Sequence, residues 1–543
     1  MTRDRPFGTV LEVGSSKANK TGSWRTERPV YRDLMPPCND ACPAGENVQA
    51  WLHHAQEGDY ERAWRQLMAD NPFPAIIGRV CYHPCETACN RVQLDGAVAI
   101  NAVERFLGDE AIRRGWTVTV TAKPTGRRIL VVGAGPSGLS AAYHLRLRGH
   151  EVVIRDGEPT AGGMMRHGIP SYRLPRDVLD AEIDRLAGMG VELELGRPVT
   201  DLAAAFEQDR FDAVFLAIGA QLSKRTYVPA SDAARVVDAL GVLHDVAVGE
   251  PPMLGRRVVV YGGGNTAMDV ARTARRLGAA DAVVVYRRTR DRMPAHADEV
   301  AQAVEEGVQL RWLSTITQAD AGTVTVERME LDDTGFPQPT GEFDELAADA
   351  LILAIGQDVD RSLLDGLSGV VVDDGVVQVD HRMMTGRPGL FAGGDMVPAE
   401  RTVTTAVGHG KRAARNIDAW LRGNDDVPAP RPELAHFDVL NPWYYPEADR
   451  AHRPRLDDED RVTTFDEVVG GLSETAALTE ARRCLSCGNC FECDNCYGLC
   501  PDDAIVKLGP GKRYVIDLDY CKGCGICAAE CPAGAIAMIP EEI

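Results

Sequence analysis

The chain has 543 residues, too many for a single hydrophobic core, so several domains are expected. Its formal net charge of −21 argues against nucleic acid and anionic membranes as partners. There is no run of about 18 apolar residues to cross a membrane, and residues 1–14 lack the apolar stretch of a secretory signal. The 15 cysteines are therefore expected in the reducing cytoplasm, as metal ligands and not as disulfides.

The cysteines fall into two blocks, five between Cys38 and Cys89 and ten between Cys484 and Cys531. Residues 48–69, inside the first block, have the apolar spacing of helices. The middle of the chain alternates apolar runs with glycine turns, which predicts parallel βαβ units. A Pro-rich polar stretch at about 427–455 predicts a linker.

The first glycine turn, Gly133-Ala134-Gly135-Pro136-Ser137-Gly138, follows an apolar strand and opens a helix. Such a turn lets a dinucleotide pyrophosphate approach the backbone at the helix N-terminus. The next strand ends at Asp156, which is placed to bond a ribose hydroxyl, and Gly163 suits a loop close to the cofactor. A bare glycine turn is the alternative, but the strand, helix, acid and spacing agree on a binding site.

A second turn, Gly262-Gly263-Gly264-Asn265-Thr266-Ala267, has the same context, with Ala267 in place of the third glycine. The following strand ends in Arg287-Arg288, where an NAD site would usually carry an acid. Arginines at that point suit a 2′-phosphate, and Arg292 could add a contact. The sequence therefore predicts NADP(H), with NAD(H) possible. The alternative is that these arginines form a solvated surface patch.

Near the C-terminus, a four-cysteine run is followed by proline and then repeated. The spacing is that of bacterial two-cluster ferredoxins, in which the fourth cysteine of each run binds the other cluster. The predicted sets are Cys490, Cys493, Cys496 and Cys531 for one [4Fe–4S] cluster, and Cys500, Cys521, Cys524 and Cys527 for the other. Zinc is the alternative, but it explains the repeated spacing poorly.

The N-terminal cysteine motifs, with residues 168–175, 264–269 and 286–288, resemble a family of flavin and iron–sulfur oxidoreductases. Its members include the glutamate synthase small subunit, dihydropyrimidine dehydrogenase and the large subunit of NADH-dependent ferredoxin:NADP oxidoreductase. Residues 389–395 resemble the closing motif of two-dinucleotide-domain flavoproteins, which implies FAD at the first site and a bond from Asp395 to its ribityl chain. The implied FAD contacts are Gly133, Gly135, Pro136, Ser137, Gly138, Asp156, Gly163, Arg173, Leu174, Gly394, Asp395 and Thr404.

Seven cysteines lie outside the ferredoxin-type runs. The family usually begins with an Arg-Cys-Leu-x-Cys-Gly motif, which here occurs at 483–488 instead. The resemblance thus implies that it folds back, so that Cys38, Cys89, Cys484 and Cys487 hold one cluster. Cys42, Cys81 and Cys85 are then one ligand short, and related domains supply a Gln or Glu from the next helix. Glu104 is that candidate, which completes four [4Fe–4S] clusters; the alternatives are a surface carboxylate, and core or redox-sensing thiols.

The expected fold is α/β, with two Rossmann-like domains preceded by a helical iron–sulfur domain and followed by a ferredoxin-like α+β domain. The expected boundaries are 1–122 for the helical domain, 123–240 and 358–425 for the two parts of the FAD domain, 241–357 for the NAD(P) domain, 426–483 for a linker and 484–543 for the C-terminal cysteine motif and ferredoxin domain.

The resemblance implies an NAD(P)H-dependent oxidoreductase subunit that passes electrons between NADP(H), FAD and [4Fe–4S] clusters. No catalytic side chain is expected, because the cofactors carry the chemistry. The expected partner, within a hetero-oligomer, is ferredoxin or a larger enzyme such as a 2-oxoacid:ferredoxin oxidoreductase. One alternative is the glutamate synthase small subunit with its separate large subunit, which does not need the ferredoxin tail. A non-catalytic scaffold is the other, and the intact nucleotide motifs disfavour it.

Overall fold

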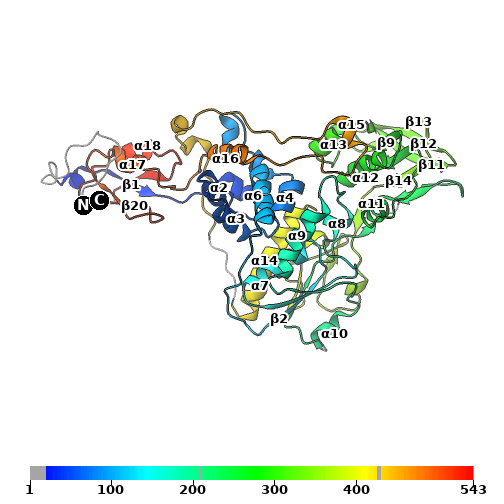
Figure 1. The fold of residues 1–543 in the computed structure, drawn as a ribbon, viewed down its shortest axis with the longest axis horizontal. Coiled ribbons are helices and arrows are strands. Elements are labelled where there is room, and N and C mark those ends of the chain that lie inside the picture. The colour runs from blue at the N-terminus through cyan, green and yellow to red at the C-terminus, as the bar shows by residue number, and fades with distance from the viewer. Residues whose placement is uncertain (1–19, 208, 225, 227, 425–429, 542–543) are drawn as a thin grey trace.

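The computed structural model describes residues 20–541 apart from positions 208, 225, 227 and 425–429, and the statements below concern those residues. The segment 1–14 and the expected boundary at residue 425 lie outside them. The described chain is elongated, with the cysteine-rich C-terminal region at one end and the second dinucleotide domain at the other (Figure 1).

The N-terminal region is helical, as predicted. Its helices are α1 (Pro37–Ala41), α2 (Val48–Gln56), α3 (Tyr60–Met68), α4 (Pro74–Val80), α5 (Pro84–Thr87) and α6 (Ile100–Arg114). Between α2 and α3, Gly58 adopts a left-handed conformation with φ 77°, and Asp59 caps α3 by accepting from the backbone N–H of Arg62. The apolar stretch 48–69 therefore forms two helices, which bury Trp51 and Trp64 in separate clusters.

The first dinucleotide domain is built on a five-stranded parallel sheet with the order β18-β5-β2-β3-β4. Its strands are β2 (Arg128–Val132), β3 (Glu151–Arg155), β4 (Glu192–Glu194), β5 (Ala213–Leu216) and β18 (Leu390–Ala392). Its helices are α7 (Pro136–Leu147), α8 (Met164–His167), α9 (Arg176–Ala187), α10 (Leu202–Glu207) and α14 (Val403–Leu421). The whole second domain lies between β5 and β18 in the sequence, yet these two strands pair. The sheet is therefore complete only after the chain has returned from the second domain.

The second dinucleotide domain repeats this plan with the order β10-β9-β8-β14-β7. Its strands are β7 (Val236–Asp238), β8 (Arg257–Tyr261), β9 (Asp281–Val285), β10 (Gln309–Arg311) and β14 (Ala350–Leu353), and its helices are α11 (Ala239–Ala247), α12 (Asn265–Arg276) and α13 (Ala297–Glu305). An antiparallel sheet of β11 (Ser314–Asp320), β12 (Thr323–Leu331) and β13 (Pro337–Ala347) adjoins it. The chain passes from the first dinucleotide domain to the second near β6 (Leu222–Ser223) and returns near β15 (Gln357–Asp358). These two strands pair with each other, so the two connections between the domains lie side by side. A small hairpin pairs β16 (Val372–Asp373) with β17 (Val376–Val377).

The C-terminal part begins with a long segment that crosses the molecule (Figure 1) and carries α15 (Asp458–Arg461) and α16 (Glu474–Arg482). Where a linker was expected, α16 packs on α2 and α6 of the N-terminal region. The ferredoxin-type region, residues 490–541, contains α17 (Asn495–Leu499), β19 (Ile505–Lys507), β20 (Tyr514–Ile516), α18 (Ile526–Ala529) and β21 (Ile536–Pro540). β1 (Glu27–Tyr31) pairs antiparallel with β21, so the first described strand belongs to the last region of the chain.

These layers confirm the predicted α/β class with a helical region before the two dinucleotide domains and a small α+β region after them. Within the described residues, no helix combines the length and apolarity needed to cross a membrane.

Candidate functional site

A cavity of about 1100 Å³ opens at the carboxyl ends of β2, β5 and β18, the usual ligand position in such sheets. Nine of the twelve residues predicted to contact FAD line it: Gly133, Gly135, Pro136, Ser137, Asp156, Gly163, Arg173, Gly394 and Asp395. We call it the flavin cavity.

The glycine turn is shaped by close backbone contacts. Gly133 has φ 107°, and a Cβ there would lie 2.4 Å from the carbonyl oxygen of Ala217, at the end of the neighbouring strand. A Cβ on Gly138 would lie 2.0 Å from the carbonyl oxygen of Gly133, so Gly138 shapes the turn without lining the cavity. Asp156 accepts from the backbone N–H of Ala134 at 2.6 Å, which holds its carboxylate beside the turn.

The polar groups of the flavin cavity fit a bound dinucleotide. Ser137 Oγ is buried and has no hydrogen-bond partner in the described part of the chain. The Asp395 carboxyl lies at the start of the turn before α14, and burial raises its pKa above the usual range. Buried polar groups are normally paired, so an unpaired hydroxyl on a cavity wall indicates a ligand partner.

Three residues predicted to contact FAD, Arg173, Leu174 and Thr404, are paired or buried elsewhere than in the flavin cavity alone. Arg173 lines the flavin cavity, but its guanidinium already donates to Asp269 at 2.8 Å and pairs with Glu299. Leu174 is fully buried in the apolar core of this domain. Thr404 lines a different cavity, described below, because it faces away from the side of α14 that carries Val403 and Ala406.

In the second dinucleotide turn, as in the first, a glycine with positive φ lies against a carbonyl oxygen that follows the neighbouring strand. Gly262 has φ 151°, and a Cβ there would lie 2.1 Å from the carbonyl oxygen of Ala354. Gly264 is the N-cap residue of α12, and Ala267 is fully buried. Asn265 and Thr266, which begin α12, line the flavin cavity, so the two predicted nucleotide sites open into one space.

The two arginines that follow β9 most closely, Arg287 and Arg288, have no acidic partner in the described part of the chain. Arg287 is exposed, and neither it nor Arg288 forms an ion pair among the residues that the structure describes. Arg288 Nε is buried and makes no hydrogen bond within that part of the chain. Arg292 is more than half exposed and lies 3.9 Å from Asp291. Two uncompensated guanidinium groups therefore stand at the strand end where a 2′-phosphate was predicted.

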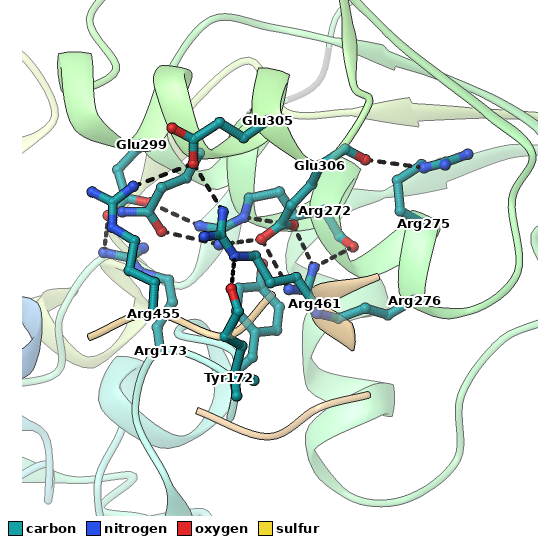
Figure 2. A network of polar contacts seen from close by, with 12 residues as sticks. Tyr172, Arg173, Arg272, Arg275, Arg276, Glu299, Glu305, Glu306, Arg455 and Arg461 are labelled. Atoms are coloured by element: carbon teal, nitrogen blue, oxygen red, sulfur yellow. Dashed lines mark hydrogen bonds and ion pairs between the residues drawn. The ribbon is translucent and has the colours of Figure 1, made fainter. Parts of the chain in front are cut away.

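A buried charge network joins the two dinucleotide domains (Figure 2). Arg272 and Arg276 of α12 bind Glu306 at 2.7 and 2.6 Å, and all three side chains are fully buried. Tyr172 donates to the carbonyl oxygen of Asp269 at 3.1 Å and lies 3.8 Å beneath the Arg276 guanidinium.

The same network includes Arg173 and the long C-terminal segment. Burial raises the pKa of Asp269 to about 6, while Arg173 opposes that shift. Arg461 and Arg455 of the C-terminal segment reach Glu305 of α13 at 2.9 and 3.3 Å (Figure 2). Removing one partner from a buried pair typically costs about 3–5 kcal/mol, so this network holds the second domain against the first.

In the ferredoxin-type region the eight predicted cysteines gather in two sets. Cys500, Cys521, Cys524 and Cys527 line a cavity of about 340 Å³. In the other set, burial raises the pKa of Cys496, and Cys490, Cys493 and Cys531 raise it further. The last cysteine of each run thus joins the other run, as predicted. The backbone N–H four residues after each of these two last cysteines donates to its sulfur at 3.3 Å.

Cys38, Cys89, Cys484 and Cys487 line a cavity of about 360 Å³, which we call the joint cavity. The returning motif is held by a buried ion pair, because Arg483 binds Asp95 at 2.9 Å. Arg91 also pairs with Asp95 and donates to the carbonyl oxygen of Arg483 at 2.6 Å. The predicted fold-back of 483–488 onto the N-terminal region is therefore present.

Cys42, Cys81, Cys85 and Glu104 line a cavity of about 300 Å³, which we call the carboxylate cavity. Glu104 is 5% exposed, so it is not the surface carboxylate of the alternative interpretation. Its Oε1 accepts from the Asn71 amide at 2.8 Å, and the same amide group donates to Glu46 at 3.0 Å. Burial raises the pKa of Glu104 well above its usual range, and Glu46 raises it further.

The cysteine sets suit a cluster better than a single ion. Among the described residues, no three His, Cys, Asp or Glu side chains converge closely enough to hold one metal ion. Three of the sets instead surround cavities of similar size. Burial raises the pKa of the thiols, for example of Cys484 to about 12, so a bound cation is needed to keep them as thiolates.

Several residues at these sites carry no motif and were not predicted. Tyr31 Oη lies 3.3 Å from Cys496 Sγ, and Tyr445 Oη donates to the carbonyl oxygen of Leu485, which lies between Cys484 and Cys487 in the sequence, at 2.9 Å. Tyr82 lines the flavin cavity and stacks on His296 at 3.5 Å. Asn71 donates to both Glu46 and Glu104, which fixes the position of the Glu104 carboxyl group. Only the position of Tyr82, next to Cys81, is a signal that the sequence offered.

Three family descriptions match the chain. The pyridine nucleotide-disulphide oxidoreductase family matches residues 127–410, dihydropyrimidine dehydrogenase domain II with its 4Fe-4S cluster matches 27–116, and the 4Fe-4S binding domain matches 514–537.

The chain is also similar to characterised proteins along most of its length. It is 38% identical over 501 residues to the NADP(+)-dependent formate dehydrogenase subunit beta of Moorella thermoacetica, which covers 84% of this chain and 71% of that one. It is 33% identical over 505 residues to the NADPH-Fe(3+) oxidoreductase subunit beta of Geobacter sulfurreducens, with coverage of 83% and 75%. It is 34% identical over 427 residues to the glutamate synthase [NADPH] small chain of Azospirillum brasilense, with coverage of 73% and 88%.

The fold and these sites define an oxidoreductase with FAD- and NADP-type dinucleotide domains and iron–sulfur domains at both ends. The chain belongs to the pyridine nucleotide-disulphide oxidoreductase family, whose match covers more than half of it. The predicted resemblance and enzyme class are confirmed. No cysteine occurs between Cys89 and Cys484, so this member has no cysteine pair in its dinucleotide domains.

Proposed function

We propose that this chain is the nicotinamide-dependent electron-transfer subunit of a larger oxidoreductase, with FAD, NADP(H) and four [4Fe–4S] clusters as its cofactors. The observation that carries the proposal is that neighbouring sites share structural elements, from the flavin cavity to the ferredoxin-type region. When bound, FAD supplies the conversion between a nicotinamide hydride and the single electrons that iron–sulfur clusters carry.

The flavin cavity and the carboxylate cavity share two walls. Val80 and Tyr82 line the first, and Cys81 between them lines the second. The start of α14 does the same, because Val403 faces the flavin cavity and Thr404 faces the carboxylate cavity. The carboxylate cavity is therefore the iron–sulfur site next to the flavin.

Two short helices connect the carboxylate cavity with the joint cavity. Cys38 lies in α1, and Cys42 is the residue that ends it. Cys85 lies in α5, and Cys89 follows two residues after that helix. Each helix thus supplies one sulfur to each cavity, which keeps the two sites adjacent.

Two half-buried tyrosines, Tyr445 and Tyr31, lie beside the remaining sites, because Tyr445 donates to the carbonyl oxygen of Leu485 at 2.9 Å and Tyr31 lies 3.3 Å from Cys496 Sγ. Burial raises the pKa of Tyr445 above its usual range, and the sulfurs of Cys484, Cys487 and Cys493 add to that shift. Burial likewise raises the pKa of Tyr31, with Cys496, Cys490 and Cys527 adding to it. The row therefore continues from the joint cavity into the first ferredoxin-type set and then into the second.

The residues of this chain bind and orient the nucleotides. We assign Asp156 and Asp395 to FAD hydroxyls, and Arg287 and Arg288 to the 2′-phosphate of NADP(H), which bidentate guanidinium groups bind well. Asn265 and Thr266 bring the second nucleotide into the flavin cavity, while the buried network around Arg173 fixes the angle between the domains.

The arginine assignment can be tested by anaerobic reduction of the purified flavoprotein. Replacing Arg287 and Arg288 with alanine is expected to raise the NADPH concentration needed to bleach the flavin at least tenfold, with little change for NADH. Arg256→Ala is the matched control, because Arg256 precedes β8 at the amino ends of the strands, whereas Arg287 and Arg288 follow the carboxyl end of β9. Equal losses for both nucleotides would contradict the assignment, and no bleaching by either would favour the non-catalytic scaffold.

The cluster count can be tested by metal analysis. Four [4Fe–4S] clusters require about sixteen iron atoms per chain, whereas about eight would confine the clusters to the ferredoxin-type region.

We propose a hetero-oligomer in which the partner docks at the ferredoxin-type end, where Cys493 and Cys524 are exposed. Support comes from the relatives from Moorella and Geobacter, both of which are named as beta subunits. Ferredoxin or a 2-oxoacid oxidoreductase is the proposed partner class; glutamate synthase is the alternative, favoured by the similarity to its small chain. NADPH-driven reduction of a ferredoxin that is lost after removal of residues 490–543 would support the docking end.

A further inference from the structure

The hydroxyl group of Thr404 is a buried donor on the wall of the carboxylate cavity. Thr404 is 3% exposed, and its Oγ1 makes no hydrogen bond among the described residues. Leaving a hydroxyl unpaired inside a protein costs about 1–3 kcal/mol. A threonine in a helix often donates to the carbonyl four residues earlier, but Thr404 is the second residue of α14, and Glu400 precedes the helix.

The surroundings of this hydroxyl point to sulfur. Thr404 lines the carboxylate cavity together with Cys42, Cys81 and Cys85. Thr404 lies in the first turn of α14 and Cys81 is the C-cap residue of α4, and both line this one cavity, so the unpaired hydroxyl shares its wall with that sulfur. The two carboxyl groups of this wall, Glu46 and Glu104, both accept from the Asn71 amide.

The position of Thr404 also matters for electron flow. The N-cap residue Thr402 accepts from the Thr405 N–H at 3.1 Å and fixes the first turn of α14. Thr402, Val403 and Ala406 line the flavin cavity, whereas Thr404 alone in that turn lines the carboxylate cavity. A group on this turn can therefore tune the iron–sulfur site that lies next to the flavin.

We propose that the Thr404 hydroxyl donates a hydrogen bond to the sulfur shell of the cluster held by Cys42, Cys81, Cys85 and Glu104, and thereby raises its reduction potential. This inference rests on the proposed function, which places a cluster in this cavity. Hydrogen bonds to the sulfurs set the potentials of iron–sulfur clusters, because a donor stabilises the more negative, reduced state. Here the donor would offset part of the negative charge of the cysteine thiolates that hold the cluster.

The test is a redox titration of the full-length holoenzyme followed by electron paramagnetic resonance. Glu104→Gln first identifies which signal belongs to the carboxylate cavity. Thr404→Val then removes the hydroxyl while keeping the shape of the side chain. We expect the reduced-to-oxidised ratio of that signal to fall about tenfold at a fixed potential, a shift of about 59 mV for one electron. Thr404→Ser should retain the wild-type titration.

Thr273→Val is the matched control. The Thr273 hydroxyl on α12 is also buried and without a hydrogen-bond partner in the described chain, but it lines none of the cysteine cavities. This variant should leave all signals unchanged. An unchanged titration in Thr404→Val, with full iron content, would overturn the inference.

Two other outcomes are also informative. If Thr404→Val and Thr404→Ala both lose about four iron atoms while Thr404→Ser keeps them, the hydroxyl is needed to hold the cluster, which supports the hydrogen bond. If the wild-type chain contains only about twelve iron atoms and Glu104→Gln alters no signal, the proposed cluster itself is wrong. Iron content thus separates a failure of the proposed function from a failure of this inference.

Discussion

The two iron–sulfur regions of this chain are assembled in opposite ways. In the ferredoxin-type region all eight cysteines come from one stretch, 490–531, and each run supplies its last cysteine to the other. In the N-terminal region the joint cavity combines Cys38 and Cys89 with Cys484 and Cys487. Asn90 even donates to Cys487 across 397 residues of chain. In the ferredoxin-type region, local turns place the cysteines. In the N-terminal region, tertiary contacts between distant segments bring them together.

The contacts that replace local turns are buried and charged. Asp95 binds both Arg91 and Arg483, and side-chain exposure is 11% for Asp95 and 2% for each arginine. Glu480 of α16 also pairs with Arg483 and accepts from the backbone N–H of Ala99 at 2.8 Å. Removing one partner of these ion pairs leaves buried charges uncompensated. The N-terminal region is therefore expected to unfold before the ferredoxin-type region does.

Asp95→Ala should produce the largest difference between the two regions. It leaves Arg91 and Arg483 without their shared carboxylate, at a cost of about 3–5 kcal/mol. We expect faster hydrogen exchange in peptides that span α16 and loss of about four iron atoms. Peptides of the ferredoxin-type region should keep their protection.

Asp519→Ala is the control for this change. Asp519 also pairs with a residue far away in the sequence, Lys20, but both side chains are 65% exposed, so solvent screens the pair and the loss of stability should be small. Unchanged α16 protection in Asp95→Ala would refute the idea that a buried joint holds the returning motif.

Gly488→Ala should have the next largest effect. Gly488 has φ 76°, and a Cβ there would lie 2.6 Å from Leu34 Cβ and 2.8 Å from Ala435 Cβ. Gly511 in the ferredoxin-type region has φ 72° but nothing within 4 Å. Both substitutions carry the left-handed cost of about 1–2 kcal/mol, and only Gly488→Ala adds overpacking of about 1–3 kcal/mol. Urea unfolding of the two variants measures the difference, and equal losses would mean that the contact with Leu34 relaxes freely.

The same contrast explains what the sequence could predict. Repeated cysteine spacing specifies turns, so the swapped sets of the ferredoxin-type region follow from the motif itself. Each glycine turn, together with Asp156 or Arg287-Arg288 after the next strand, likewise encodes a local shape and charge. The return of Cys484 and Cys487 was predictable only because a family motif was missing near Cys38.

Contacts that depend on tertiary packing could not be predicted. Thr404 is predicted to contact FAD, yet a one-residue step along α14 from Val403 turns it toward the carboxylate cavity. Arg173 was assigned the same role, but the approach of α12 and α13 brings Asp269 and Glu299 to it. The pairing of β1 with β21 joins segments about 500 residues apart, and a five-residue strand with one buried side chain carries too little pattern to reveal it.

The smallest expected difference is in the response to mild acid. His144 of α7 is 2% exposed, and its Nε2 contacts the carbonyl oxygen of Asp70 in the N-terminal region at 3.2 Å. Burial lowers its pKa to about 3, and Arg148 and Lys411 lower it further. In the unfolded chain the pKa is about 6.5, so this group contributes its full stability above that pH and loses it progressively as the pH falls toward 3.

Between pH 7 and pH 5 the loss through His144 should reach about 1–2 kcal/mol. Residues 484–543 contain no histidine, so the ferredoxin-type region should not respond in this interval. Hydrogen exchange, corrected for the intrinsic effect of pH, should show weaker protection around Asp70 at pH 5 and unchanged protection at 490–541. His144→Gln should flatten the response, whereas His436→Gln, at an exposed position, should leave it intact. If both regions lose protection equally, buried titratable groups are not what distinguishes them.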